Sequence, residues 1–320
     1  MTVKKIVKPE KHIDLGPGKE FDLIRALLAK WGQSSSGVGD DAAILQVPAN
    51  EKLVVTTDTS VDGVHFKREW LNHSEIGYRA TAAALSDLAA MAARPLGVVI
   101  ALTLPKADRD NATELAAGIQ EAASASHCPI VGGDITSGHT LSLTITAFGS
   151  AVTPLTRSGA TPGDRVYVTG LLGGPGAAVR AWLAGKHPNA HDRARFAHPA
   201  PRIQAALALA SRGATAGIDI SDGLMGDLAH IVAASGIRIE VDLERIPRVP
   251  GVSALQAASS GEEYELAVTA PDIDVRSFHE ELGMQLTEIG RIVAGPQGVE
   301  LREAGKKIAT PAGYDHFNRK

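Results

Sequence analysis

Carboxylates stand at the ends of apolar or small-residue segments along this chain, and almost no basic residue lies beside them. Short acidic patches occur at residues 37–41, 56–63, 132–134 and 219–223, and a further carboxylate, Asp87, lies within an alanine-rich segment. A folded chain cannot easily bring so many uncompensated carboxylates together unless cations hold them. Oxygen ligands of this kind suit Mg2+, and Mg2+ beside glycine-rich turns points to phosphate chemistry.

The composition is that of a globular protein and argues against several classes of function. Hydrophobic residues make up 44% and charged residues 21% of the 320 positions, which is enough for a sizeable core. A net charge of −4 and only 4% aromatic residues predict no nucleic-acid partner. No apolar stretch is long enough to predict a membrane span. The single cysteine, Cys128, excludes an internal disulfide and fits a cytoplasmic protein.

The pattern of segments predicts two domains of the α/β (α+β) class. Residues 1–19 combine lysines with proline and glycine and are expected to form a flexible tail. Residues 20–152 form the predicted N-terminal domain and residues 153–320 the C-terminal one, because 153–164 is rich in turn residues. Strands and helices alternate in both halves, which favours two mixed sheets with flanking helices.

Hydrophobic periodicity and capping residues predict the individual elements. Helices are expected at residues 20–31, 74–93, 111–127, 174–184, 201–213 and 223–234. Strands are expected at residues 43–47, 53–57, 98–104, 141–148, 165–169, 218–220, 237–241 and 264–269. Ser74 is the predicted N-cap of its helix, and Asn111 with Glu114 resembles a capping box. Residues 132–134 are expected to form a turn.

Asp87 allows two interpretations. Its helical neighbours at three and four positions are Ala83, Ala84, Ala90 and Met91, and none of them can neutralise a carboxylate. Asp87 could therefore face water on an amphipathic helix. The small apolar stripe around it instead suggests a packed face, where Mg2+ would bridge Asp87 to other carboxylates.

Each carboxylate at a strand end also has an ordinary structural explanation. Asp58 could close its strand as an Asx-turn, and the same holds singly for Asp40, Asp41 and Asp134. Recurrence of the same chemistry at several strand ends favours a metal site, because ligand sites of α/β folds gather there.

The segment around Ser221 and Asp222 precedes a predicted helix and can also be interpreted in two ways. Either residue could be the N-cap, but a helix N-terminus also binds phosphate. Asp219 lies on the same side of the strand as Ser221, which makes a bridging cation plausible. Asp227, in the helix that follows, is expected to face solvent.

Other familiar catalytic patterns are absent from the sequence. There is no P-loop motif and no Gly-x-Ser-x-Gly elbow, and the glycine-rich residues 170–176 lack the spacing of a dinucleotide fingerprint. Lone histidines such as His65 and His230 are, on pattern alone, more typical of structural positions.

Seven motifs occur in a fixed order along the chain: GVGDDA (37–42), TTDTSVDGVHF (56–66), LSDLAAM (85–91), VGGD (131–134), TRSGATPGD (156–164), IDISDGL (218–224) and GYDHF (313–317). Together they resemble the thiamine-monophosphate kinases of the aminoimidazole ribonucleotide synthetase superfamily, whose ATP-binding fold has no P-loop. The resemblance spans roughly residues 20–317.

This resemblance implies Mg2+-dependent and ATP-dependent phosphorylation of thiamine monophosphate to thiamine diphosphate, the last step of thiamine diphosphate biosynthesis. It also implies a homodimer formed through the N-terminal domain. The implied Mg2+ ligands are Asp41, Thr56, Thr57, Asp58, Asp87, Asp134, Asp219 and Asp222, of which Asp87, Asp134 and Asp222 are the implied catalytic residues. The implied ATP contacts are Gly133, Asp134, Arg157 and Ser221, and the implied thiamine monophosphate contacts are His65, Glu262 and Tyr314.

The chain departs from the family pattern at three places, one of which is a short stretch between Gly236 and Ser260. Residues 260–264 read Ser-Gly-Glu-Glu-Tyr where the family usually has Gly-Gly-Glu-Asp-Tyr, and Ala84 stands where asparagine is common.

The competing functions are another enzyme of the superfamily, a two-metal phosphatase, and a non-catalytic sensor that binds nucleotide or thiamine phosphate. The lone mid-chain Cys128 disfavours the selenophosphate synthetases and the hydrogenase-maturation relative, which use a reactive or terminal cysteine.

Overall fold

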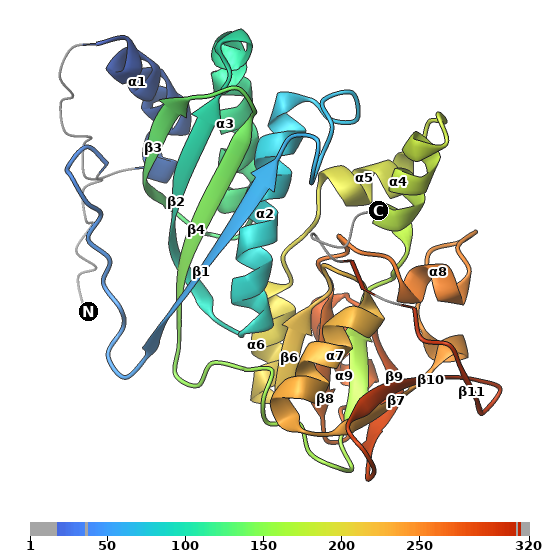
Figure 1. The fold of residues 1–320 in the computed structure, drawn as a ribbon. Coiled ribbons are helices and arrows are strands. Elements are labelled where there is room, and N and C mark those ends of the chain that lie inside the picture. The colour runs from blue at the N-terminus through green and yellow to red at the C-terminus, as the bar shows by residue number, and fades with distance from the viewer. Residues whose placement is uncertain (1–17, 36–37, 312, 315–320) are drawn as a thin grey trace. The chain divides into compact units, whose positions relative to one another are not determined.

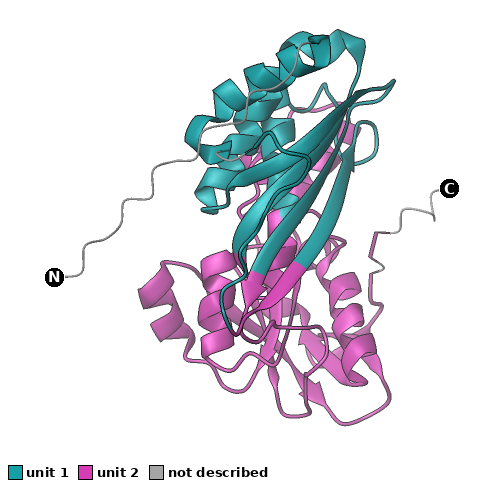
Figure 2. Cartoon of the chain, turned by 90° about the vertical axis from the view of Figure 1, so that its left-hand side faces the viewer, with its two compact units in different colours: residues 1–49, 55–84, 95–149 teal, residues 50–54, 85–94, 150–320 magenta. Residues whose placement is uncertain are grey.

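The computed structural model describes residues 18–35, 38–311 and 313–314, so the predicted tail lies outside the described residues up to position 17. The chain divides into two compact units (Figures 1 and 2). Unit 1 comprises residues 1–49, 55–84 and 95–149, and unit 2 comprises residues 50–54, 85–94 and 150–320. Among the described residues, no helix combines the length and apolarity needed to cross a membrane.

Unit 1 is built on a four-stranded sheet in the order β1-β4-β2-β3. Its strands are β1 (Lys52–Val61), β2 (Arg94–Leu104), β3 (Ile130–Ser137) and β4 (Ser142–Ala151), and its helices are α1 (Lys19–Trp31), η1 (Gly32–Ser35), α2 (His73–Ala90), η2 (Lys106–Asn111) and α3 (Ala112–Ala125). Strands β2 and β3 are parallel, and α3 lies between them in sequence. Figure 1 shows α1 and α3 on the same side of the sheet, where the Trp31 indole N–H donates to the Ala116 carbonyl at 2.9 Å.

The two faces of this sheet differ in polarity. Leu143, Ile145 and Ala147 of β4 alternate into the core. On the other face, hydroxyls of β1 and β4 pair across the strands, Thr57 with Thr146 at 2.9 Å and Thr59 with Thr144 at 3.0 Å. The helices therefore cover one face, while a threonine ladder lines the other.

Helices α2 and α3 approach closely through two glycines. A Cβ atom at Gly77 would lie 2.1 Å from the Leu115 carbonyl oxygen, and one at Gly118 would lie 1.7 Å from the Ser74 carbonyl oxygen. Any larger residue at either position forces the two backbones apart.

Unit 2 is built on a seven-stranded sheet in the order β11-β10-β7-β9-β5-β8-β6. Its strands are β5 (Arg165–Thr169), β6 (Ala216–Asp219), β7 (Arg238–Asp242), β8 (Leu266–Ala270), β9 (Leu286–Val293), β10 (Gly298–Glu303) and β11 (Lys306–Ile308). Its helices are α4 (Gly174–Leu183), α5 (Ala190–Ala197), α6 (Ile203–Ser211), α7 (Leu224–Ser235), η3 (Leu243–Arg245), α8 (Ala254–Ala258) and α9 (Val275–Leu282). All neighbouring strands are antiparallel except the parallel pair β7 and β10.

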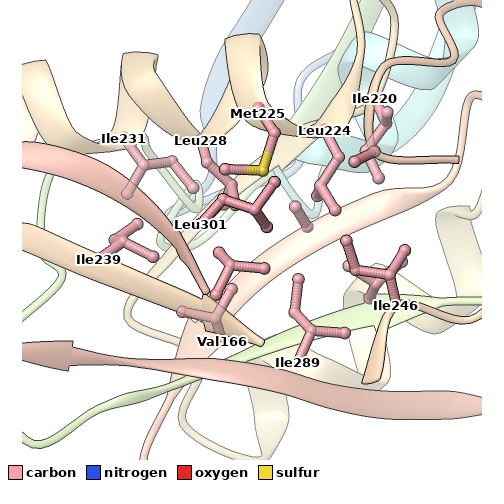
Figure 3. Close-up of a cluster of buried hydrophobic side chains, with 14 of the residues drawn as sticks. Val166, Ile220, Leu224, Met225, Leu228, Ile231, Ile239, Ile246, Ile289 and Leu301 are labelled. Atoms are coloured by element: carbon pink, nitrogen blue, oxygen red, sulfur yellow. The ribbon is translucent and has the colours of Figure 1, made fainter. Parts of the chain in front are cut away.

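Both faces of the central strands are buried. Side chains of β5 alternate between two cores: Val166 and Val168 pack with α7 residues such as Leu228 (Figure 3), and Tyr167 packs with Ile203 of α6 and Phe278 of α9. This arrangement leaves the strand ends and their loops as the places where polar side chains gather. The predicted class, mixed α/β with two mixed sheets and flanking helices, is confirmed.

Several local predictions are wrong. Residues 43–47 form no strand, and Ile44 is 92% exposed, because no strand of the described chain pairs with them. Helix α2 begins at His73 rather than after Ser74, since Asn72 and Glu75 cap it reciprocally at 2.8 and 3.0 Å. Asn111 makes no capping hydrogen bond, because η2 leads directly into α3.

The predicted turn at residues 132–134 is instead part of β3. Gly133 pairs with Ile100, and a Cβ atom at Gly133 would lie 2.4 Å from the Ile100 carbonyl oxygen. The glycines at this position therefore reflect close backbone approach rather than a turn.

We expect Gly118→Ala to lower the free energy of unfolding by about 1–3 kcal/mol, because the added methyl group overlaps the α2 backbone. Alanine has the higher helix propensity, so packing and propensity act in opposite directions. Urea unfolding followed by circular dichroism measures the change. Ser124→Ala, at an exposed site on the same helix, is the control. Unchanged stability of Gly118→Ala would contradict the close approach.

Candidate active site

The end of β6 and the start of α7 place three predicted site residues in one short loop of unit 2. Asp219 ends β6, and Ser221 and Asp222 follow it. The prediction that Ser221 or Asp222 is the N-cap of α7 is wrong, because Gly223 takes that position with no side-chain cap. Instead the carboxylate of Asp227 accepts the main-chain N–H groups of Ser221 at 3.1 Å and Asp222 at 3.2 Å.

The prediction that Asp227 faces solvent is therefore wrong. Its side chain is only 2% exposed, because the first turn of α7 folds back over the loop it stabilises. The pKa of Asp227 is raised to about 8, first by burial and then by the nearby carboxylates of Asp219 and Asp222. Negative charge is thus crowded at this strand end, and a bound cation would relieve it.

The C-terminal turn of α2 belongs to unit 2 and reaches the same strand end. The Ser86 hydroxyl donates to Asp219 Oδ2 at 2.7 Å, and both groups are buried. Asp87 follows Ser86 in the helix and is partly buried, so its segment lies beside Asp219. Unit 2 therefore brings the segments of Asp87, Asp219 and Asp222 together.

A strained loop at residues 260–264 packs against this site. The Glu262 N–H donates to the Ser221 carbonyl at 2.7 Å, and the Tyr264 hydroxyl donates to the Glu262 carboxylate at 2.6 Å. Glu262 and Tyr264 both have positive φ angles, 63° and 53°, which cost side chains about 1–2 kcal/mol each. The N–H of Tyr314 donates to the Asp222 carbonyl at 3.0 Å, so Tyr314 joins the same cluster.

Arg157 lies beside the N-terminal part of β6, rather than at the end that carries Asp219. The Gly217 N–H donates to the Thr156 carbonyl at 3.0 Å, and Ser235 donates to the Arg157 carbonyl at 2.9 Å. The Arg157 residue is exposed.

In unit 1, β1 continues through Asp58 to Val61, so the predicted strand end at Asp58 is wrong. Strand alternation places Thr56 and Asp58 on one face, while the Thr57 side chain bonds to Thr146 on the other. Thr57 can therefore reach a cation held by Asp58 only through its main-chain carbonyl.

Asp134 and Gly133 lie on β3, at the opposite edge of this sheet from β1. Three strand spacings separate the two edges, which is about 14 Å. Asp41 lies in the bend before residues 43–47, where its N–H bonds to Asp40 Oδ1 at 3.0 Å. Within unit 1, the structure thus leaves Asp58 and Asp134 on separate edges.

A small apolar pocket opens beside Gly133 and Asp134. Helices α1 and α3 and strands β2 and β3 enclose it. Its lining residues are Ile24, Leu27, Leu28, Trp31, Val38, Ile100, Leu102, Ala112, Leu115, Ala116, Ile119, Gly132, Gly133, Asp134 and Ile135.

His65 lies in a loop held by ion pairs. Its Nδ1 accepts the Val61 N–H at 3.1 Å, which in the neutral ring places the proton on Nε2. Arg68 of the same loop pairs with Asp62 at 2.6 Å and with the buried Asp108 at 2.7 Å. The loop therefore fixes both the position and the tautomer of His65.

Among the described residues, no three His, Cys, Asp or Glu side chains are arranged to enclose a metal ion. The donors nevertheless fit Mg2+ chemically, because they are all oxygens and crowd negative charge near Asp227. Mg2+ keeps several waters and binds one or two carboxylates together with substrate phosphates, so it needs no closed protein cage.

Sequence reasoning missed a buried charge network behind the 260–264 loop. Glu263 and Glu265 are buried; Arg195 contacts both, at 3.2 and 3.4 Å, and Arg202 pairs with Glu265 at 2.5 Å. Burial raises the pKa of Glu263 to about 7, against the lowering effects of Ser260, Arg195 and the Gly173 N–H. The unusual glutamate at this position was the available signal.

Two family models match most of the chain. AIR synthase related protein, N-terminal domain, matches residues 39–151, and AIR synthase related protein, C-terminal domain, matches residues 161–301. The chain is 36% identical over 321 residues to a thiamine-monophosphate kinase of Salmonella typhimurium, covering 93% of this chain and 98% of the relative. Identity to the Escherichia coli K12 enzyme of the same name is 36% over 301 residues, covering 88% and 91%.

Solved structures give the same result. The thiamine-monophosphate kinase of Stenotrophomonas maltophilia K279a superposes with a TM-score of 0.78 at 37% identity, covering 91% of this chain and 98% of that one. A structure described as AaThiL complexed with AMPPCP and TMP gives 0.73 at 29% identity, covering 95% and 100%. Hydrogenase maturation protein HypE in complex with ATP gives 0.75 at 20% identity, covering 93% and 95%, which shows a shared fold alone. The resemblance predicted from the sequence is confirmed.

The raised pKa of Glu263 predicts a pH-dependent stability. Its pKa is about 7 when folded and 4.5 ordinarily, so the folded state binds more protons between these values, and stability falls as pH rises through this window. In the native protein the free energy of unfolding should fall by on the order of 3 kcal/mol between pH 4.5 and pH 7, and Glu263→Gln should abolish this fall. Urea unfolding between pH 5 and pH 8 measures most of it.

Glu244→Gln is the control for this measurement. The Ala304 N–H lowers the pKa of Glu244 below 4.5, so its titration lies outside the measured range. An unchanged pH slope in Glu263→Gln would show that Glu263 stays ionised.

Proposed function

Because the chain belongs to the thiamine-monophosphate kinase family, we propose that it transfers the γ-phosphoryl group of ATP to thiamine monophosphate, in the last step of thiamine diphosphate biosynthesis. The observation that carries this proposal is the gathering in unit 2 of the Asp219–Asp222 loop, the α2 segment with Asp87, and the backbones of Glu262 and Tyr314. The structure described as AaThiL with AMPPCP and TMP supports the choice of ligands.

The acceptor chemistry requires positioning more than a base. A phosphate monoester has its second pKa near about 6, so thiamine monophosphate is already largely ionised at neutral pH. The obstacle is repulsion between two anions, about 1 kcal/mol per pair of unit charges at 4 Å in water and more where water is excluded.

We assign the Mg2+ ions to Asp41, Thr56, Thr57, Asp58, Asp87, Asp134, Asp219 and Asp222, with Thr57 acting through its carbonyl. When bound, Mg2+ screens the phosphates and supports in-line transfer. Of these ligands, Asp87, Asp134 and Asp222 are the proposed catalytic residues.

The remaining site residues bind the substrates in this proposal. Gly133, Asp134, Arg157 and Ser221 contact ATP, with the guanidinium of Arg157 on phosphate. His65 donates from Nε2 to thiamine monophosphate, the Glu262 carboxylate offsets the positive thiazolium ring, and Tyr314 packs against the substrate.

We further propose that residues 20–152 form one domain and residues 153–320 a second. Two copies of the first domain, which contains the sheet of unit 1, pair through their sheets. Leu53 and Val55 of β1 are exposed large apolar residues beside the threonine ladder, and β1 and β3 are both open edges. Closing two four-stranded sheets into one eight-stranded barrel covers this face and removes the edges. With its two-fold axis along the barrel, this closure sets β1 of one copy beside β3 of its partner and brings the segments of Asp58 and Asp134 together at one proposed metal site.

The lone, buried Cys128 is the basis for proposing a cytoplasmic enzyme.

The first experiment incubates the purified protein with ATP, Mg2+ and thiamine monophosphate, omits each in turn, and detects product by thiochrome fluorescence after chromatography. Thiamine diphosphate formed only in the complete mixture supports the kinase. Phosphate released from thiamine monophosphate without ATP would indicate a phosphatase, and binding without turnover a sensor.

Asp87→Asn should reduce turnover by roughly 10³-fold or more, because one charge of the proposed Mg2+ site is lost. The fold should change little, which thermal unfolding checks. Asp110→Asn, at an exposed acidic residue of η2, is the charge-matched control. Near-normal turnover in Asp87→Asn would remove Asp87 from the metal site.

Val55→Lys should convert the dimer to a monomer, because the proposed barrel would have to bury two ammonium groups. Light scattering after gel filtration measures the mass, and turnover should fall with it. Leu183→Lys, at an exposed leucine of α4 in unit 2, is the control. A Val55→Lys protein that keeps the native mass would contradict the barrel.

A further inference from the structure

The glycine-rich segment at residues 170–176 has a structural cause other than nucleotide binding. A Cβ atom at Gly170 would lie 2.4 Å from Glu265 Oε1, one at Gly174 would lie 2.8 Å from Arg195 Cδ, and one at Gly176 would lie 2.6 Å from Ser260 Oγ. Each of these glycines therefore leaves room for a polar side chain from another part of unit 2.

The side chains of Ser260 and Glu263 cap α4 from a distant part of the sequence. Its N-cap residue, Gly173, offers no side-chain cap of its own. Glu263 Oε1 accepts the Gly173 N–H at 2.5 Å, and Ser260 Oγ accepts the Gly176 N–H at 3.1 Å. Ser260 and Glu263 are only 2% and 3% exposed, so these bonds form away from competing water, at the positive end of the helix dipole.

The other oxygen of Glu263 is fixed by charge. Arg195 of α5 donates to Glu263 Oε2 at 3.2 Å and contacts Glu265 at 3.4 Å. Arg202 donates to both oxygens of Glu265, at 2.8 and 2.5 Å. Removing one member of such a buried network leaves another charge uncompensated, so the network resists rearrangement.

Between Ser260 and Glu263 the chain passes directly over the site loop. A Cβ atom at Gly261 would lie 2.7 Å from the Ser221 carbonyl oxygen, which also accepts the Glu262 N–H. Glu262 adopts a left-handed conformation that an unsupported loop would abandon. Anchors on both sides therefore hold Glu262 in this conformation.

We propose that Ser260 and Glu263 are positioning residues that clamp the 260–264 loop onto the N-terminus of α4 and thereby orient Glu262 toward thiamine monophosphate. The inference rests on the proposed function for the role of Glu262. Neither Ser260 nor Glu263 contacts a substrate in this proposal. Both clamp residues stand where this chain departs from the family pattern, and they hydrogen-bond to each other.

The test compares Ser260→Ala, Glu263→Gln and the double variant with the native protein in steady-state kinetics. Ser260→Ala and Glu263→Gln should each raise the KM for thiamine monophosphate about tenfold, while kcat and the KM for ATP change less than about twofold. Because both residues act through one clamp, the KM for thiamine monophosphate in the double variant should be close to that of the single variant with the higher KM. Ser259→Ala is the matched control, since its hydroxyl donates to the Leu255 and Gln256 carbonyls of α8.

Three results would overturn the clamp. These are an unchanged KM for thiamine monophosphate in both single variants, a fall in kcat at constant KM, or multiplicative effects in the double variant. Thermal unfolding checks each fold, and Ser260→Ala alone decides the matter if Glu263→Gln does not fold. A native protein that forms no thiamine diphosphate would instead defeat the proposed function. Calorimetric titration with thiamine monophosphate would then test the clamp through binding alone, with an unchanged affinity in Ser260→Ala counting against it.

Discussion

The site in unit 2 depends on one buried carboxylate and the two main-chain N–H groups it accepts. Asp227 holds Ser221 and Asp222 in place from inside α7. The backbone they belong to then accepts from Glu262 through the Ser221 carbonyl and from Tyr314 through the Asp222 carbonyl. A residue without any assigned contact to substrate thus determines where several proposed substrate contacts lie.

This arrangement concentrates negative charge before any ligand is present. Asp219 and Asp222 lie close enough to Asp227 to help raise its pKa to about 8. Crowded carboxylates of this kind attract divalent cations. In the proposed function, a cation accompanying the nucleotide would offset this charge.

Much of the fold could be predicted from sequence because its signals are local. The alternation in β5 and the periodicity of α7 identify their elements closely, and the ordered motifs identify the family. Residues 43–47 misled because an apolar run predicts a strand only where a partner strand exists, and Ile44 has none among the described residues. The prediction of a turn at residues 132–134 was wrong because glycine is needed there for the close approach of the Ile100 backbone.

The carboxylates of the candidate site stand out in the sequence because they recur, and their roles stay a prediction. The burial of Asp227 and the opposed side chains of Thr57 and Asp58 could not be predicted, because they follow from tertiary packing and strand phase. The Ser260 and Glu263 pair was visible only as an oddity of sequence. The capping role of this pair could not be predicted, because it depends on the position of α4, which lies more than 80 residues earlier in the chain.

The placement of Asp58 and Asp134 on opposite edges of one sheet has a genetic consequence. In the proposed barrel, each metal site draws one of these residues from each chain. A protein defective at Asp58 and another defective at Asp134 would both be inactive alone. Mixed in one cell, they would assemble some dimers in which both lesions fall in the same site and the other site is intact. Such alleles would complement each other, although neither encodes a working enzyme.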